Sequence, residues 1–243
     1  IAFLLAEGVE ELEFYVPFMR LQEEGADVIA AGLDLKPIRG KNGLEIIPAA
    51  RIDALQSRDV FAVVVPGGWA PDKLRRDAAV MKLIREMDAA GKTLGIICHG
   101  GLVAISAGIV RGRRATGSLG IKDDLVNAGG TWVDAPALRE GHLVWGRVVA
   151  DIPAFCRELV AALIEAAASA PCDHLPNFVR PAPAYEPLNS LARSQRRCAK
   201  LLNGLIHHFG DHPFDPCLAL RALDLIDQGS DLAAGCGVSR EVA

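Results

Sequence analysis

Aromatic residues are scarce in this sequence. They make up 5% of the 243 residues, although 51% of the chain is hydrophobic. The core must therefore be built mainly from Ala, Val, Leu and Ile, a composition typical of a buried parallel sheet covered by helices. No uninterrupted apolar run reaches the roughly 18 residues that cross a bilayer. The net charge of −4 leaves no basic face, so we expect neither a membrane nor a nucleic-acid partner.

Paired cysteine motifs are also missing. The six cysteines form no CxxC pair and lack the dense spacing of a secreted disulfide scaffold. The apolar run that begins at Ile1 does not have the pattern of a signal peptide. We therefore expect a reducing, cytoplasmic setting, and we expect no metal or other cofactor. The length exceeds that of a typical single core, which predicts one sizeable domain with an appendage.

Over the first 169 residues, apolar runs alternate with stretches of helical periodicity. Strands are expected at 1–6, 26–31, 61–65, 93–97, 131–133 and 138–149, a hairpin around 41–47, and helices up to residue 22 and at 78–90, 102–107, 121–128 and 152–168. This order predicts a doubly wound, flavodoxin-like α/β domain over residues 1–169, with a mostly parallel sheet between helices. The loops after the first, third and fourth parallel strands should meet at one sheet edge, where such folds bind ligands.

The composition changes from residue 170 onward. Five prolines between 171 and 187 predict a semi-rigid linker over 170–187. Two short helices are expected within 188–243, and this helical extension is too small to be stable alone. We expect it to pack on the α/β domain or on another subunit. His207, His208, Asp211 and His212 could form a metal site, although surface histidines at a helix end are the favoured interpretation.

Residues 91–108, with the sequence GKTLGIICHGGLVAISAG, combine a buried strand with the start of a helix. Cys98 lies on the turn between them and is followed by His99, Gly100 and Gly101. A nucleophile on such a strand-to-helix turn is exposed at the sheet edge, and the helix N-terminus favours its thiolate. The same pattern also fits an inert core cysteine, and the residues alone leave both interpretations open.

Two further loops should lie at the same edge. Pro66-Gly67-Gly68-Trp69 follows the third strand, and its glycines allow the backbone to approach a ligand closely. Trp69 could form a wall of the pocket or part of an interface. Glu10 lies in the loop after the first strand, with other carboxylates near it at positions 7, 11 and 13. Acidic residues in a first helical turn can also simply complement the helix dipole.

These motifs resemble the DJ-1/PfpI superfamily, and within it the PfpI-type proteins, over residues 1–168. The resemblance is carried by AEGVEELEFYVP around Glu10, PGGWAPD, ICHG around Cys98, and GIKDDLVNAGGTWVD. It implies that Cys98 is the nucleophile, that a protonated Glu10 carboxyl hydrogen-bonds its thiolate, and that His99 is the partnering base or acid. Two adjacent negative charges are costly, which makes a retained proton on such a carboxyl reasonable.

The resemblance also assigns roles to the surrounding residues. The expected substrate and oxyanion positions are Gly67, Gly68, Trp69, Gly100, Gly101 and Ser118, and Asp72 matches an acid that approaches the histidine of a neighbouring subunit. The chain departs from the PfpI-type pattern in having Gly101 where proline is common and Ser118 where a tyrosine is often found. Losing that phenol removes a proton donor, which weakens the case for peptidase activity. The resemblance does not extend to residues 171–243.

We therefore expect a cofactor-independent hydrolase or lyase that uses Cys98 as a covalent nucleophile on a small carbonyl compound, as a glyoxalase III, deglycase or hydratase would. It should act as a homo-oligomer on a small-molecule substrate. The alternatives are an intracellular cysteine peptidase, a redox-sensing or chaperone-like stress protein, and a biosynthetic enzyme whose C-terminal helices form a lid. A GxSxG elbow is absent, and no His-x-Glu pair follows Cys98 to complete a glutamine amidotransferase triad.

Overall fold

The structure, a computed structural model, describes residues 1–169. The predicted linker at 170–187, the predicted helical extension at 188–243 and the histidine cluster at 207–212 lie outside the described residues and stay predictions. Within the described range, no helix is long and apolar enough to cross a membrane.

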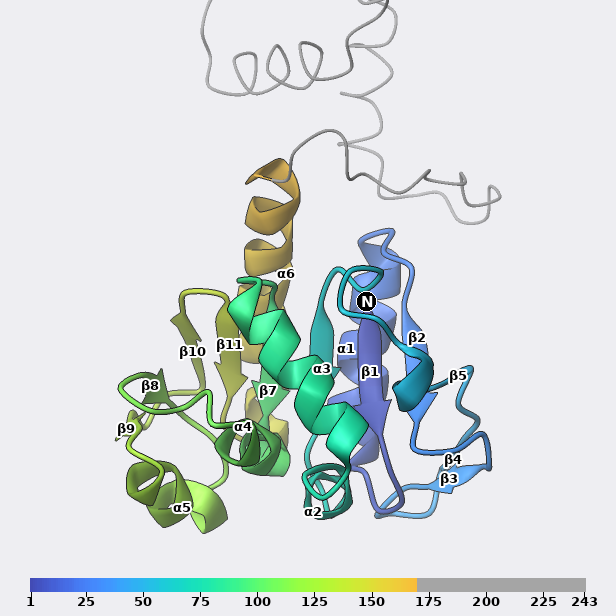
Figure 1. Cartoon of the computed structure of the whole chain (residues 1–243), viewed down its shortest axis with the longest axis horizontal. Coiled ribbons are helices and arrows are strands. Elements are labelled where there is room, and N and C mark those ends of the chain that lie inside the picture. The colour runs from blue at the N-terminus through green and yellow to red at the C-terminus, as the bar shows by residue number, and fades with distance from the viewer. Residues whose placement is uncertain (170–243) are drawn as a thin grey trace, which may run out of the picture. The chain divides into compact units, whose positions relative to one another are not determined.

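A seven-stranded sheet forms the centre of the domain (Figure 1). Its strands in spatial order are β10 (Ala137–Glu140), β11 (Leu143–Gly146), β7 (Leu94–Ile97), β6 (Val63–Val65), β1 (Ala2–Leu5), β2 (Ile29–Gly32) and β5 (Ala50–Arg51). All neighbouring pairs are parallel except β10 and β11, which form an antiparallel hairpin at one edge. Two small ribbons lie outside this sheet, the antiparallel pair β3 (Ile38–Arg39) and β4 (Glu45–Ile46) and the parallel pair β8 (Arg114–Ala115) and β9 (Thr131–Trp132).

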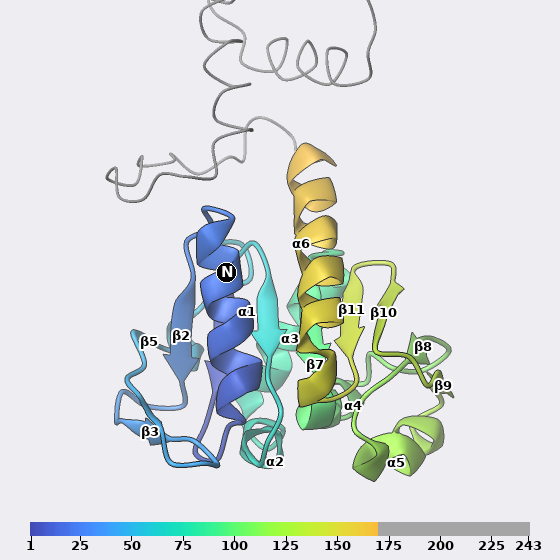
Figure 2. The same ribbon diagram turned by 180° about the vertical axis from the view of Figure 1, so that it is seen from behind.

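Helices cover both faces of the sheet. The helices are α1 (Glu11–Glu23), α2 (Ala70–Leu74), α3 (Ala78–Ala89), α4 (Gly101–Ala107), α5 (Lys122–Asn127) and α6 (Ile152–Ser169). Figure 1 shows α2, α3 and α4 together on one face, and Figure 2 shows α1 and α6 side by side on the other. This three-layer arrangement confirms the predicted doubly wound α/β fold.

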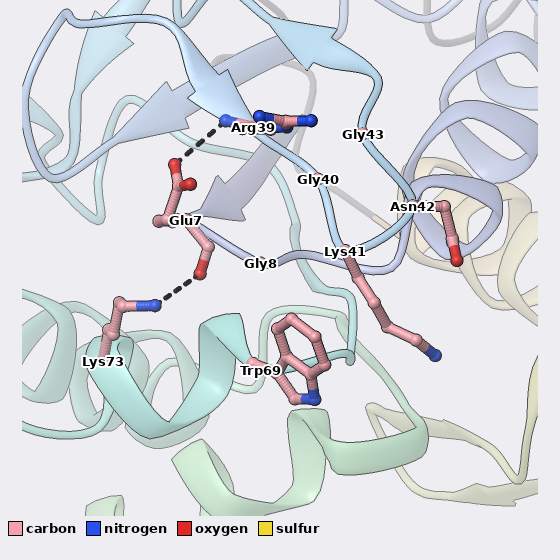
Figure 3. Close-up of a pocket in the computed structure, with 9 residues that line it drawn as sticks. All are labelled: Glu7, Gly8, Arg39, Gly40, Lys41, Asn42, Gly43, Trp69 and Lys73. Carbon is pink, nitrogen blue, oxygen red and sulfur yellow. Dashed lines mark hydrogen bonds between the residues drawn. The ribbon is translucent and has the colours of Figure 1, made fainter.

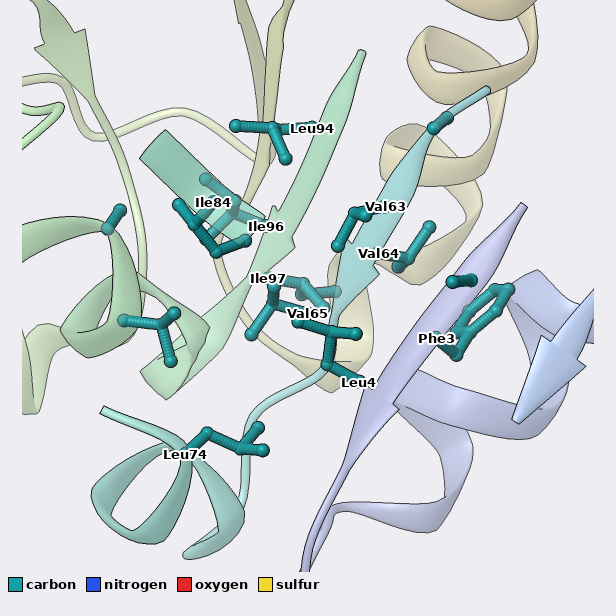
Figure 4. Packing of buried hydrophobic residues seen from close by; sticks show 14 of the residues in the cluster. Phe3, Leu4, Val63, Val64, Val65, Leu74, Ile84, Leu94, Ile96 and Ile97 are labelled. Carbon is teal, nitrogen blue, oxygen red and sulfur yellow. The ribbon is translucent and has the colours of Figure 1, made fainter. Parts of the chain in front are cut away.

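The core is aliphatic, as the composition predicts. The central strands are fully buried, and their Val, Leu and Ile side chains pack against the helices on either face (Figure 4). Aromatic packing is local, with Phe3 from β1 meeting Phe14 and Phe18 of α1 at ring-centroid distances of 5.6 and 5.5 Å. These contacts hold α1 against the sheet and so fix the direction in which its first turn faces.

Several details differ from the sequence prediction. The short strands β5 and β8 and the helix α2 are absent from the prediction, because all three are too short to show a periodic pattern. The other predicted strands and helices in this range occur with their ends shifted by a few residues.

Candidate active site

Cys98 lies on a strained turn at the carboxyl end of β7. A 3-10 turn, Cys98–Gly100, joins that strand to α4. The φ of Cys98 is +58°, and no other non-glycine residue of the described chain has a positive φ. Such strain persists only where the surroundings enforce it, and it is typical of a nucleophile elbow. The turn therefore directs the sulfur away from the sheet core, and Cys98 is half-buried rather than enclosed.

Three loops meet at this edge, as the topology predicts. The loop after β1 binds the loop after β6: the Glu10 N–H donates to the Gly67 carbonyl at 3.2 Å, and the Trp69 N–H donates to the Gly8 carbonyl at 2.7 Å. A Cβ on Gly68, whose φ is +76°, would collide with the Gly8 carbonyl oxygen. Only glycine fits at position 68, so the double glycine makes the close approach of the two loops possible.

The carboxyl group beside Cys98 belongs to Glu13, which corrects the assignment of that contact to Glu10. Glu13 Oε2 accepts the Gly67 N–H at 2.7 Å, and the side chain is fully buried. A Cβ on Gly67 would lie 2.6 Å from Glu13 Oε2 and 2.8 Å from Cys98 Cβ, so the three residues meet at one point. Glu13 Oε1 is buried and accepts no N–H or O–H group of residues 1–169, which leaves the Cys98 thiol as its polar neighbour.

Burial and mutual repulsion raise the pKa values of both members of this pair. Burial raises the pKa of Glu13 to about 7, against the lowering effect of the Gly67 N–H. Burial, followed by the charge of Glu13, raises the pKa of Cys98 to about 12, while the N–H groups of His99 and Gly68 act in the opposite direction. The two groups titrate together. Between these two values the pair keeps one proton and carries one negative charge.

Glu10 and Glu11 do not pair with the cysteine; they bind the loop between β3 and β4. Lys41 Nζ donates to Glu10 Oε2 at 2.8 Å, and Asn42 Nδ2 donates to Glu10 Oε1 at 3.3 Å. Glu11 Oε1 accepts the N–H groups of Asn42 and Leu44 at 2.7 and 3.2 Å. These hydrogen bonds outweigh the effect of burial and lower the pKa of Glu11. The two carboxylates thus fasten the loop next to the cysteine, and they bring Lys41 to the site.

His99 lies on the other side of the sulfur. Its Nδ1 is 3.3 Å from Cys98 Sγ. Burial, and then the charge of Lys41, lowers the pKa of His99, so the imidazole is neutral at pH 7 and able to accept a proton. A Cβ on Gly120 would lie 3.3 Å from His99 Nε2, which places this nitrogen against the segment that carries Ser118. The Ser118 hydroxyl oxygen accepts the Gly120 N–H at 3.4 Å.

A cavity of about 410 Å³ opens above the sulfur. Its lining combines polar side chains with a short apolar wall, and consists of Glu10, Glu13, Lys41, Gly68, Trp69, Cys98, His99, Ser118, Val148, Val149 and Ala150. The predicted residues Gly67, Gly100 and Gly101 do not line it. Gly100 and Gly101 serve packing, because a Cβ on Gly100 would strike the Val65 carbonyl and one on Gly101 would lie 2.6 Å from Ile121 Cδ1.

The sequence of residues 1–162 matches the family model described as the DJ-1/PfpI family. The chain belongs to the DJ-1/PfpI family. It is 40% identical over 163 residues to a deglycase of Pyrococcus horikoshii, an alignment that covers 67% of this chain and 98% of the relative. It is 32% identical over 159 residues to a Bacillus subtilis protein named "Putative cysteine protease YraA", covering 65% of this chain and 94% of the relative.

A solved structure extends the similarity. A two-domain protein of Anabaena variabilis that contains DJ-1/ThiJ/PfpI-like and ferritin-like domains is 25% identical, with a TM-score of 0.66; the match covers 94% of this chain and 67% of that chain. Together with the named relatives, this makes the chain an enzyme-like member of the DJ-1/PfpI family.

Within this DJ-1/PfpI domain, sequence reasoning missed the functional placement of Lys41. The signal available was the string Gly40-Lys41-Asn42-Gly43, a cation inside a glycine-flanked turn.

Asp72, the predicted inter-subunit acid, lies on α2 with 67% of its side chain exposed, and it pairs with Arg76 at 3.0 Å. Within residues 1–169, the hydrogen bonds of Asp72 go to Arg76, and none joins it to Cys98 or His99.

Proposed function

We propose that the protein is a cofactor-independent enzyme in which Cys98 attacks the carbonyl carbon of a small aldehyde or ketone. The reaction class is that of a glyoxalase III or deglycase, or of a related hydrolase or hydratase. Support comes from the relatives named as deglycases and from the dimensions of the cavity, which suit a small molecule. The observation that carries the proposal is the strained Cys98 held between the buried Glu13 carboxyl and the His99 imidazole.

The chemistry follows from the shared proton. When the proton of the pair resides on Glu13, Cys98 Sγ is a thiolate stabilised by the N–H groups of Gly68 and His99. The sulfur forms a bond to the carbonyl carbon, the C=O π pair moves onto oxygen, and that oxygen takes the proton held by Glu13. The product is a thiohemiacetal, and the neutral imidazole of His99 then removes a proton from it in the next step.

The proposal is tested by following the loss of glyoxal and methylglyoxal with the wild type and with Cys98→Ala. We expect turnover by the wild type and none by the variant. Cys156→Ala is the matched control, because Cys156 is a buried thiol on α6 that does not line the cavity above Cys98. Retained turnover in Cys98→Ala, with both variants folded by circular dichroism, would overturn the proposal.

A cysteine peptidase is the second candidate, supported by the relative named for that activity. Cleavage of a dipeptide amide by the wild type, lost in Cys98→Ala and unaccompanied by aldehyde removal, would favour it. A redox-sensing stress protein is the third alternative. It predicts a peroxide-induced mass increase at Cys98 with no turnover of either substrate class.

We further propose that the enzyme self-associates and that Asp72, which is exposed on α2, contributes to the neighbouring subunit's site. Light scattering of the full chain should then give a mass above 25.8 kDa, the mass of one chain. A cytoplasmic location is proposed as well, since both described cysteines are free thiols, as expected in a reducing compartment.

A further inference from the structure

The cavity above Cys98 borders a second one. The second cavity measures about 380 Å³ and is lined by Glu7, Gly8, Arg39, Gly40, Lys41, Asn42, Gly43, Trp69 and Lys73. Figure 3 shows the loop between β3 and β4 on one side of it, and Trp69 and Lys73 on the other. Lys41 and Trp69 line both cavities. A ligand that reaches Cys98 can therefore extend over these two residues into the second space.

Positive charge dominates the second cavity. Arg39, Lys41 and Lys73 line it, against the single carboxylate of Glu7. Glu7 Oε2 accepts the backbone N–H of Arg39 at 3.0 Å, and the Glu7 carbonyl accepts from Lys73 Nζ at 2.8 Å (Figure 3). Arg39 lines the cavity, and none of the ion pairs between residues 1–169 includes its guanidinium, so its charge is available to a ligand. A space of this kind favours an anion.

Lys41 lies between the two cavities, and an ion pair holds its ammonium in place. Its ammonium binds Glu10, whose side chain is only 5% exposed, whereas 39% of the Lys41 side chain is exposed. Asn42 binds the second oxygen of Glu10 and fixes the carboxylate. An ammonium has three N–H donors, and Glu10 takes one. The other two have no hydrogen-bond acceptor among residues 1–169, and Lys41 lines both cavities.

We propose that Lys41 selects carbonyl substrates that carry a carboxylate or phosphate group, by binding that group while the carbonyl carbon lies at Cys98. Glu10 is a positioning residue for Lys41. Arg39 and Lys73 extend the same preference to longer anionic tails in the second cavity. This inference rests on the proposed function, since it requires Cys98 to be the nucleophile that meets the substrate.

The test uses two alkylating reagents of matched reactivity and different charge. Iodoacetate is anionic and iodoacetamide is neutral, and peptide mass spectrometry gives the rate for each at Cys98. We expect the iodoacetate-to-iodoacetamide rate ratio, normalised to glutathione, to exceed one in the wild type. In Lys41→Gln it should fall by about tenfold, the effect of one cation a few ångströms from the charge. Lys41→Arg should restore it to within about twofold of wild type.

A double variant controls for the effect of the unpaired Glu10 carboxylate that remains in Lys41→Gln. Glu10→Gln/Lys41→Gln lacks both charges of the ion pair, and it should show the same loss of the preference for iodoacetate. Equal loss of both rates would mean that Lys41 tunes the thiol and does not bind the anion, which would overturn the inference alone. Failure of wild-type Cys98 to react with either reagent would overturn the proposed function and this inference together.

Protection experiments distinguish the two kinds of anion. Glyoxylate and glyoxal differ by a carboxylate, and glyceraldehyde 3-phosphate and glyceraldehyde differ by a phosphate. We expect the anionic member of at least one pair to protect Cys98 from iodoacetamide at lower concentration, and the pair that shows this identifies the group selected. Arg39→Gln/Lys73→Gln should reduce the preference only for the longer phosphate. No difference within either pair would contradict the inference.

Discussion

The assignment of the cysteine's partner to Glu13 predicts a specific change in thiol chemistry. Glu13→Gln keeps an oxygen for the Gly67 N–H but removes the group that shares a proton with Cys98. The wild-type pair loses its first proton near pH 7, and the proposed function requires the remaining proton to lie on Glu13, so that Cys98 is then the thiolate. In the variant, the thiol ionises alone in a buried place, with a pKa at or above its ordinary 9.0. The midpoint of Cys98 alkylation should rise from about 7 to 9 or higher.

The size of the effect at pH 7 follows from the proposed position of the proton on Glu13. About half of the wild-type pairs are singly deprotonated at this pH and then carry a thiolate, whereas a lone thiol with the ordinary pKa of 9.0 is about 1% ionised. The rate of alkylation by iodoacetamide should therefore fall by up to about 50-fold. Peptide mass spectrometry over a series of pH values from 5 to 10 measures the rate and its midpoint at Cys98 separately from other cysteines.

Glu10→Gln is the matched control, because it removes the same charge from a neighbouring carboxyl. The negative charge of Glu10 contributes to the raised pKa of Glu13, so its loss should leave the alkylation midpoint at or below about 7. A midpoint that stays near 7 in Glu13→Gln but rises in Glu10→Gln would refute the assignment and return the role to Glu10.

Three further changes test the packing and the charges around the site. Gly67→Ala places a Cβ 2.6 Å from Glu13 Oε2. It should slow Cys98 alkylation and lower the free energy of unfolding, measured by chemical denaturation, by about 1–3 kcal/mol. In the control Gly25→Ala, the added Cβ has no atom within 4 Å, so the alkylation rate should not change. Glu11 has a lowered pKa, so the stability it contributes is present above pH 4.5 and is lost as the pH falls through its folded value. Glu11→Gln should therefore lower the unfolding free energy by about 2 kcal/mol at pH 7 and by less at pH 3 in urea titrations. Asp88→Ala removes the ion pair of α3 with Arg113, just before β8, and the hydrogen bond with His142 in the β10–β11 turn. It should lower the melting temperature, and an unchanged value would contradict the contribution of these contacts.

The position of Cys98 follows from local sequence and topology. A buried β-branched strand that ends at Cys-His-Gly-Gly must turn there, and parallel strands bring the loops after β1, β6 and β7 to one edge. The choice between Glu10 and Glu13 does not follow in this way. The two residues are three apart at the start of α1 and lie on the same face, so either could meet the sulfur.

A distant contact decides between these carboxyls. Lys41, which lies 31 residues further along the chain in the β3–β4 loop, donates a hydrogen bond to Glu10 and forms an ion pair with it. Glu13, one helical turn deeper, then meets Gly67 and the cysteine. The position of Lys41 depends on how the β3–β4 hairpin packs, which no periodicity in the sequence reveals. The same dependence explains why sequence reasoning missed Lys41 itself.

The pH dependence of aldehyde removal tests the central claim most directly, because it reports on the shared proton during turnover. With the Cys98–Glu13 pair as nucleophile, kcat/KM for methylglyoxal should rise through a midpoint near pH 7, reach a plateau, and vanish in Cys98→Ser. A kcat/KM that is independent of pH between 5 and 9, or that survives in Cys98→Ser, would contradict the account.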